Sequence, residues 1–195
     1  MNMKTVSRTM LVLPLLLLGT FVMANDTPKV LFEFSGADAA KEWQTVNDGV
    51  MGGVSEGNVR ITKEKTLEFF GNLSLENNGG FASARTRAGK LDLSQYDALE
   101  FKVRGDGRTY YFNIHVPSRQ IAFSYRAKFA TEKDKWQDVR IPLKEFKATS
   151  FGAEVPNALP LDPKNIEGIG FLLSDKKAGP FKLEVEWIKG SAAVR

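Results

Sequence analysis

Hydrophobic and polar residues alternate one by one along much of this chain. Between residues 121 and 129, Phe123 and Tyr125 alternate with Ser124 and Arg126, and residues 100–104 and 182–187 repeat the pattern. A period of two is typical of antiparallel strands with one buried face. Further strands are predicted at residues 30–34, 58–62, 66–70, 81–86, 110–116, 136–141 and 166–173. About ten short antiparallel strands with turn residues between them predict an all-β sandwich or jelly roll.

Helical periodicity is scarce by comparison. Residues 37–43 predict about two helical turns that need tertiary support, and residues 144–146 predict a single turn. Residues 147–165 contain three prolines and no clear period, which predicts a long loop. Because no repeat or linker divides residues 25–195, we expect them to form one domain.

Residues 1–24 have the order of a secretory signal peptide. Lys4 and Arg8 precede an apolar run over residues 10–22, and Val22-Met23-Ala24 follows as a cleavage site. The run is shorter than the ~20 residues of a membrane-spanning helix, although an uncleaved N-terminal anchor remains the alternative. The sequence therefore predicts a periplasmic or secreted protein. Since the chain has no cysteine, disulfides and a lipoprotein anchor are excluded.

The charge of the chain excludes one class of partner. Loss of Lys4 and Arg8 with the signal peptide lowers the formal net charge from +4 to +2, and the remaining charges are interspersed. A nucleic-acid-binding protein carries a clustered basic stripe instead. We therefore expect no nucleic-acid partner.

Three glycine-rich clusters stand out, at residues 47–55, 77–85 and 104–107. Asp-Gly and Asn-Gly pairs within them are typical of turns with glycine at positive φ. Loops at one end of a sandwich often carry function, so these clusters supply candidate partner-binding or structural residues. Arg85 and Arg104 could instead pair with Asp48 or Asp106 and act structurally. The candidates are Asp48, Met51, Gly52, Gly53, Asn78, Gly79, Gly80, Arg85, Arg104 and Asp106.

A second candidate surface follows from strand alternation around the single histidine. In the strand over residues 110–116, Tyr111, Asn113 and His115 point the same way. If the next strand pairs with it, Arg126 joins the same face. Aromatic rings with a few fixed polar groups suit a small ligand or a sugar. The alternative is a plain solvated sheet face.

The sequence contains few residues that could form a catalytic site or a metal site. One histidine and no cysteine leave only oxygen ligands, which suit calcium or magnesium rather than zinc. Asp48, Asp106 and Asp175 lie in loops, but no Asp-x-Asp-x-Asp run is present. We predict no metal, no cofactor and no catalytic residue. An enzyme would require a deep pocket with two close carboxylates, or His115 beside an acid.

The ordered motifs resemble the complex I intermediate-associated protein 30 family over roughly residues 30–190. The resemblance rests on Trp43, on the glycine clusters, and on Trp136, Ile141-Pro142, Ile169-Gly170-Phe171 and Gly179-Pro180-Phe181. It implies a galactose-binding-like β-sandwich. Mitochondrial members of that family act as chaperones in assembling the membrane arm of respiratory complex I, without catalysis.

We therefore expect a non-enzymatic, protein-binding β-sandwich. Its partner would be a protein of the cell envelope, and assembly of a membrane complex is the role that the resemblance implies. The alternative is a carbohydrate-binding module of the periplasm or cell exterior that uses the face around Tyr111.

Overall fold

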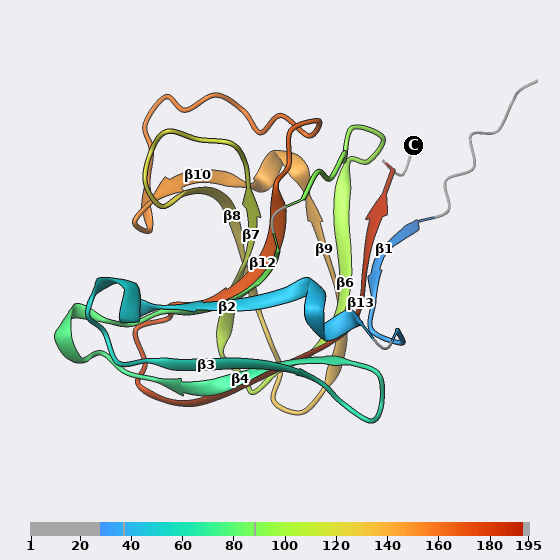
Figure 1. The fold of residues 1–195 in the computed structure, drawn as a ribbon. Helices are drawn as coiled ribbons and strands as arrows, with labels where there is room; N and C mark the ends of the chain where they lie inside the picture. The colour runs from blue at the N-terminus through green and yellow to red at the C-terminus, as the bar shows by residue number, and fades with distance from the viewer. Residues whose placement is uncertain (1–27, 37, 88, 193–195) are drawn as a thin grey trace, which may run out of the picture.

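The computed structural model describes residues 28–36, 38–87 and 89–192. The predicted signal peptide lies outside the described residues. Two antiparallel sheets pack face to face and form a β-sandwich, as Figure 1 shows. The prediction of an all-β sandwich is thus confirmed. Among the described residues no helix is long and apolar enough to cross a membrane.

The first sheet has six strands in the order β3-β4-β13-β6-β9, with β1 paired to β13. Its strands are β1 (Lys29–Glu33), β3 (Glu56–Ile61), β4 (Leu67–Leu73), β6 (Ala98–Arg104), β9 (Trp136–Pro142) and β13 (Gly179–Ser191). The second sheet has seven strands in the order β11-β10-β8-β7-β12-β5-β2. Its strands are β2 (Trp43–Asn47), β5 (Ala82–Thr86), β7 (Thr109–His115), β8 (Phe123–Ala130), β10 (Lys147–Ser150), β11 (Ala153–Glu154) and β12 (Gly168–Leu173).

The structure contains three strands that the pattern did not predict. The expected helix over residues 37–43 is only one 3-10 turn, η1 (Ala39–Glu42), and β2 follows it directly. The expected loop over residues 147–165 contains β10 and β11, which form a short hairpin. These three strands are too short to show a clear alternation of apolar and polar residues. They form because their backbone groups can pair with the free edge of a neighbouring strand. The predicted turn near residue 144 is η4 (Leu143–Glu145).

An aromatic cluster fills the space between the two sheets. Phe101 of the six-stranded sheet stacks on Phe112 of the seven-stranded sheet with ring centroids 4.9 Å apart, and Phe129 meets the Phe101 ring at 5.0 Å. Phe171 packs against Phe112 at 5.0 Å and against the buried Trp43 at 6.2 Å. Burial of large aromatic side chains supplies most of the stabilisation in such a core.

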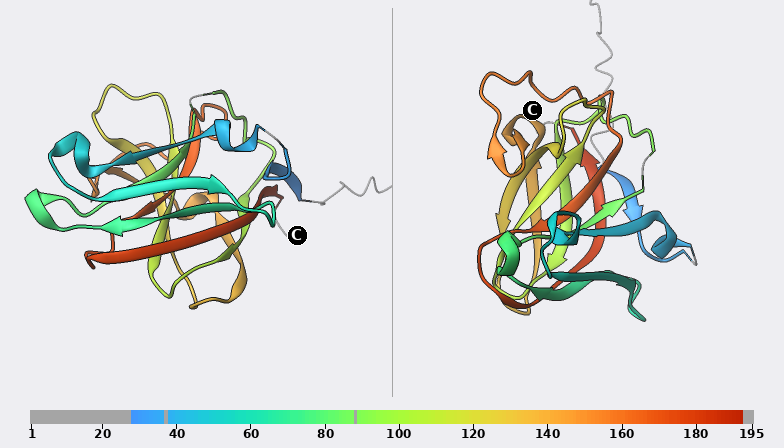
Figure 2. Two further views of the ribbon diagram at one scale, coloured as in Figure 1. Left: turned by 60° about the horizontal axis from the view of Figure 1, so that its bottom comes forward. Right: turned by 60° about the vertical axis from the view of Figure 1, so that its left-hand side comes forward.

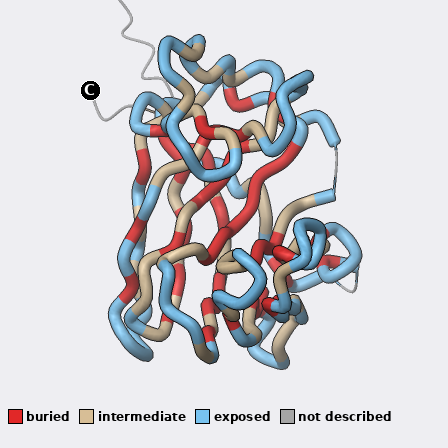
Figure 3. Tube along the Cα trace, turned by 90° about the vertical axis from the view of Figure 1, so that its left-hand side faces the viewer, coloured by how far each residue is buried: buried red, intermediate tan, exposed pale blue. Residues whose placement is uncertain are grey.

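The seven-stranded sheet is curved, and its outer face, which points away from the core, is concave. Figure 1 shows the curvature, with β2 on one side and β10 on the other. Figure 3 looks towards this outer face. The middle strands of the seven-stranded sheet are largely buried, although no other sheet packs on this outer face. All six residues of β12 are buried. We call this surface the concave face.

Candidate functional site

The first two glycine clusters meet around one buried carboxylate, that of Asp48. Asp48 begins the 3-10 turn η2 (Asp48–Met51) and is 1% exposed. Its Oδ1 accepts a hydrogen bond from the Ser55 backbone N–H at 2.8 Å, and its Oδ2 accepts one from the Ser55 hydroxyl at 2.6 Å. Oδ2 also accepts the backbone N–H groups of Gly80 at 2.6 Å and Phe81 at 3.2 Å. A single side chain therefore ties residues 48–55 to residues 80–81.

Two of the glycines are required because Asp48 fills the space beside them. A Cβ on Gly53 would lie 2.4 Å from Asp48 Cγ, and one on Gly79 would lie 2.6 Å from Asp48 Oδ2. Positive φ falls on Gly52, at 89°, and on Gly80, at 124°, rather than on Gly49 or Gly79. The prediction that the glycines of the Asp48-Gly49 and Asn78-Gly79 pairs adopt positive φ is therefore wrong. Close approach to a buried carboxylate explains Gly53 and Gly79 instead.

Hydrogen bonds lower the pKa of the Asp48 carboxyl. Burial alone would raise the pKa, but the bonds from Ser55, Gly80 and Phe81 outweigh that effect, and the pKa falls below its ordinary value. The carboxylate is therefore ionised at neutral pH, and it accepts its hydrogen bonds from the two loops rather than from solvent.

Apolar side chains are exposed around this carboxylate. Met51 is 57% exposed, Val50 72%, Val54 49% and Leu75 45%. Leu75 immediately precedes η3 (Glu76–Asn78), which carries Asn78. Figure 2 shows η2 and η3 side by side at one end of the sandwich. We call residues 48–55 and 74–81 the glycine-loop end.

The third glycine cluster has different partners. Arg104 does not pair with Asp48 or Asp106. Its Nη2 bonds Glu184 Oε2 at 2.6 Å, and its guanidinium lies over the Trp136 ring at 5.0 Å. Asp106 Oδ2 accepts the Lys182 backbone N–H at 2.9 Å and the Tyr110 hydroxyl at 3.1 Å.

Sequence reasoning missed a further residue of this third loop, Arg108. It forms a two-point ion pair with Asp175, at 2.6 Å and 3.0 Å, and donates to the Pro180 carbonyl at 3.2 Å. Its partners lie about seventy residues away in the chain, so no local pattern identifies it. The loop is thus fixed to the start of β13.

The concave face carries the second predicted set together with Arg85. Asn113 of β7 lies opposite Arg126 of β8 and opposite Gly170 of β12, and Gly170 in turn lies opposite Arg85 of β5. The predicted pairing of the two strands is confirmed, and Tyr111, Asn113, His115 and Arg126 share one face. The Arg126 guanidinium covers the Tyr111 ring at 4.4 Å.

Two polar side chains of this face have buried atoms without a partner. Asn113 is 5% exposed, and its Oδ1 accepts no hydrogen bond among the described residues. The same holds for His115 Nε2. Burial first, and the nearby Arg85 charge second, lower the pKa of His115 to about 4. The imidazole is therefore neutral at pH 7.

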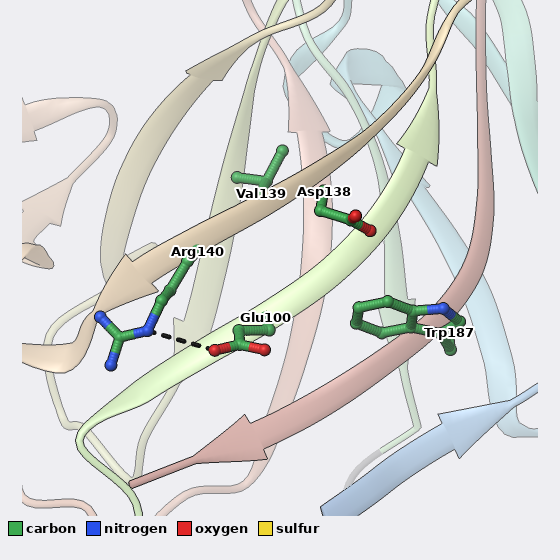
Figure 4. Close-up of a pocket in the computed structure, with 5 residues that line it drawn as sticks. All are labelled: Glu100, Asp138, Val139, Arg140 and Trp187. Atoms are coloured by element: carbon green, nitrogen blue, oxygen red, sulfur yellow. Dashed lines mark hydrogen bonds and ion pairs between the residues drawn. The ribbon is translucent and has the colours of Figure 1, made fainter. Parts of the chain in front are cut away.

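One hollow of the described surface, away from both candidate surfaces, contains two acids, Glu100 and Asp138. Figure 4 shows this hollow, on the outer face of the six-stranded sheet, lined by Glu100, Asp138, Val139, Arg140 and Trp187. Arg140 Nε donates to Glu100 at 3.1 Å, which holds that carboxylate as an ion pair. No predicted site residue lines this hollow. In the part of the chain that the structure describes, no group of three or more acids and histidines could hold a metal ion.

Comparison with known proteins identifies sequence relatives. Residues 32–185 match the family described as complex I intermediate-associated protein 30. The mitochondrial complex I intermediate-associated protein 30 of Mus musculus is 30% identical over 183 residues, which cover 82% of this chain and 55% of that protein. The Drosophila melanogaster protein of the same name is 27% identical, with 82% and 61% covered. The chain thus spans little more than half the length of these relatives.

Solved structures show the same fold. A family 11 carbohydrate-binding module from Clostridium thermocellum, in complex with a β-1,3-1,4-mixed-linked tetrasaccharide, has a TM-score of 0.68 at 20% identity and covers 86% of this chain and 97% of the module. An agarase has a TM-score of 0.58 at 18% identity, with 86% of this chain and 25% of the agarase covered.

Proposed function

Because the chain belongs to the complex I intermediate-associated protein 30 family, we propose that it is a non-enzymatic binding protein that assists assembly of a membrane protein complex. We place this role in the cell envelope, on the strength of the signal-peptide pattern in residues 1–24. The partner is a protein subunit that the chain holds during assembly. The relatives' names support an assembly role, and the glycine-loop end supplies a surface for it.

The observation that carries this proposal is the set of exposed apolar side chains on loops fixed by Asp48. Val50, Met51 and Val54 are all about half exposed or more, and exposed apolar patches mark protein interaction sites. Fixed loops lose little conformational entropy on binding, which favours affinity. A flexible loop with the same side chains would bind less tightly.

The test is capture of a membrane complex from envelope extracts by the tagged protein with a photo-crosslinker at residue 50, which is exposed beside Met51. We expect one multi-subunit complex to be enriched, and Met51→Lys to reduce its recovery about tenfold or more, as loss of a central interface residue does. Lys63→Glu, on the exposed turn between β3 and β4, is the matched control. Equal recovery with Met51→Lys and with Lys63→Glu would contradict the proposal.

A second candidate function is carbohydrate binding at the concave face. The shared fold with the tetrasaccharide-bound module supports it, as do the buried unpartnered atoms of Asn113 and His115. Sugar hydroxyls can donate to and accept from such groups. Retention of the protein on an immobilised glycan, lost with Tyr111→Ala, would support this function. A glycan array without any retained polymer would exclude it.

A further inference from the structure

The two sheets differ in how their charges are arranged. On the outer face of the six-stranded sheet, cations and carboxylates pair across strands, as in Lys102–Glu186 at 2.8 Å and Arg140–Glu100 at 3.1 Å. The strands of the seven-stranded sheet carry four cations, Arg85, Arg126, Lys128 and Lys147, and Glu154 is the single acid among their described residues. The concave face therefore has an excess of positive charge that its own side chains do not neutralise.

Arg85 is the one cation of these four that lies on the β2 side of the face. It lies on β5, next to the buried strand β12, and its Nε donates to Ser83 Oγ at 3.0 Å. Within the described ranges it forms no ion pair, and its two Nη atoms donate to no other residue. Burial lowers the pKa of Arg85, yet a guanidinium stays charged in proteins. The Nη groups of this half-buried guanidinium can bind a carboxylate or phosphate through two parallel hydrogen bonds.

Unpartnered neutral atoms lie beside Arg85. Gly170 separates Arg85 from Asn113 in the same row of the sheet, and a glycine leaves no side chain between them. Asn113 Oδ1 and His115 Nε2 are buried without a partner among the described residues. A buried polar atom without a hydrogen bond is costly, so these atoms are satisfied when a ligand supplies hydroxyl groups.

We infer that the concave face binds a saccharide that bears a carboxylate, such as a uronic-acid oligosaccharide, with Arg85 binding the carboxylate and Asn113 and His115 binding hydroxyl groups. The inference rests on the second candidate function above and specifies its ligand. A planar guanidinium matches a carboxylate with two parallel hydrogen bonds. Tyr111, whose ring is covered by the Arg126 guanidinium, lies two residues before Asn113 on β7 and shares this face.

The position within the sheet favours a saccharide over an acidic peptide. β5, β12 and β7 each have a strand on both sides, so their backbone groups are already paired. An extended peptide could not add to these strands by backbone hydrogen bonds, which is the usual mode of peptide binding to a sheet. Only side chains are available here, and they are the amide, imidazole, hydroxyl and guanidinium groups that recognise sugars.

The test uses three probes with the purified protein: tri-galacturonate, its methyl ester, in which neutral ester groups replace the charged carboxylates, and penta-glutamate. Binding is followed by titration calorimetry and by NMR shifts of the Asn113 side-chain amide and the His115 ring. We expect tri-galacturonate to bind at least about tenfold more tightly than the ester, as for one charge-assisted contact. Arg85→Gln should abolish this preference, and Lys63→Gln, outside the concave face, should keep it. Thermal unfolding of each variant checks that it is folded.

The remaining outcomes overturn the inference in distinguishable ways. Equal binding of tri-galacturonate and its ester, unchanged by Arg85→Gln, would leave a carbohydrate site without charge selection. Binding of neither saccharide would exclude the carbohydrate function itself. Tighter binding of penta-glutamate with shifts at Asn113 would identify an acidic protein segment as the ligand.

Discussion

At the scale of single residues, Asp48 ties two separate loops together. Its carboxylate satisfies three backbone N–H groups and one hydroxyl from two separate loops. Asp48→Asn keeps the shape but replaces charged acceptor oxygens with one neutral oxygen and an NH₂ group. We expect the free energy of unfolding to fall by about 2–3 kcal/mol, as measured by urea denaturation. Asp138→Asn, at an exposed position, should change it little.

The same carboxylate links stability to pH. Its folded-state pKa is lowered, so its contribution is complete above the unfolded-state pKa of ~3.9 and is lost as pH falls through the folded-state value. The difference in unfolding free energy between the wild type and Asp48→Asn should therefore be larger at pH 7 than at pH 2.5. An equal difference at both pH values would contradict this assignment.

His115 makes the stability of the fold depend on pH in a higher pH range than Asp48 does. Its pKa is lowered to about 4, by burial and by Arg85, whereas an unfolded histidine titrates near 6.5. Protonation therefore favours the unfolded chain, and stability should decline as pH falls from about 6.5 towards 4. An NMR titration of the imidazole should give a midpoint well below 6.5. Arg85→Gln should move that midpoint upward, and a midpoint near 6.5 in the wild type would contradict the burial argument.

At the scale of elements, Gly170 sets how closely β12 and β5 approach. A Cβ at this position would lie 2.3 Å from the Ala84 carbonyl oxygen. Gly170→Ala should destabilise the fold by about 1–3 kcal/mol, because the two strands must move apart. Gly49→Ala is the matched control, since no atom lies within 4 Å of its added Cβ. Equal melting temperatures for the two variants would show that the strands can adjust without cost.

The elements also show what the sequence could and could not predict. Strict alternation identified β7 and β8, and their register places Arg126 beside Asn113 as expected. Alternation could not place Arg85 on the same face as Asn113. The strand that lies between β5 and β7 in the sheet is β12, which comes more than fifty residues after β7 in the chain. The burial of Asp48 was equally hidden, since two of its donors, Gly80 and Phe81, lie more than thirty residues away. Contacts between distant segments determine both candidate surfaces.

At the scale of the whole molecule, the two sheets share one core. Phe101 contacts Phe112, Phe129 and Phe171, so aromatic side chains of both sheets pack together. A shared core predicts a single cooperative unfolding transition. Far-UV circular dichroism and the fluorescence of the buried Trp43, measured in a Trp136→Phe, Trp187→Phe background, should give the same midpoint. Separate midpoints would mean that the sheets unfold independently.

The place of β13 has a consequence for the order in which the chain is made. This strand is the last one described, yet it lies between β4 and β6 and also pairs with β1, the first one. A growing chain on the ribosome therefore exposes the edges of β4 and β6 until residues 179–191 have emerged. Open strand edges invite pairing with other chains, and contacts between distant segments form slowly. The six-stranded sheet therefore cannot close before residues 179–191 have been synthesised. Until then the chain is incompletely folded, and an incompletely folded polypeptide can still be threaded through a translocation channel.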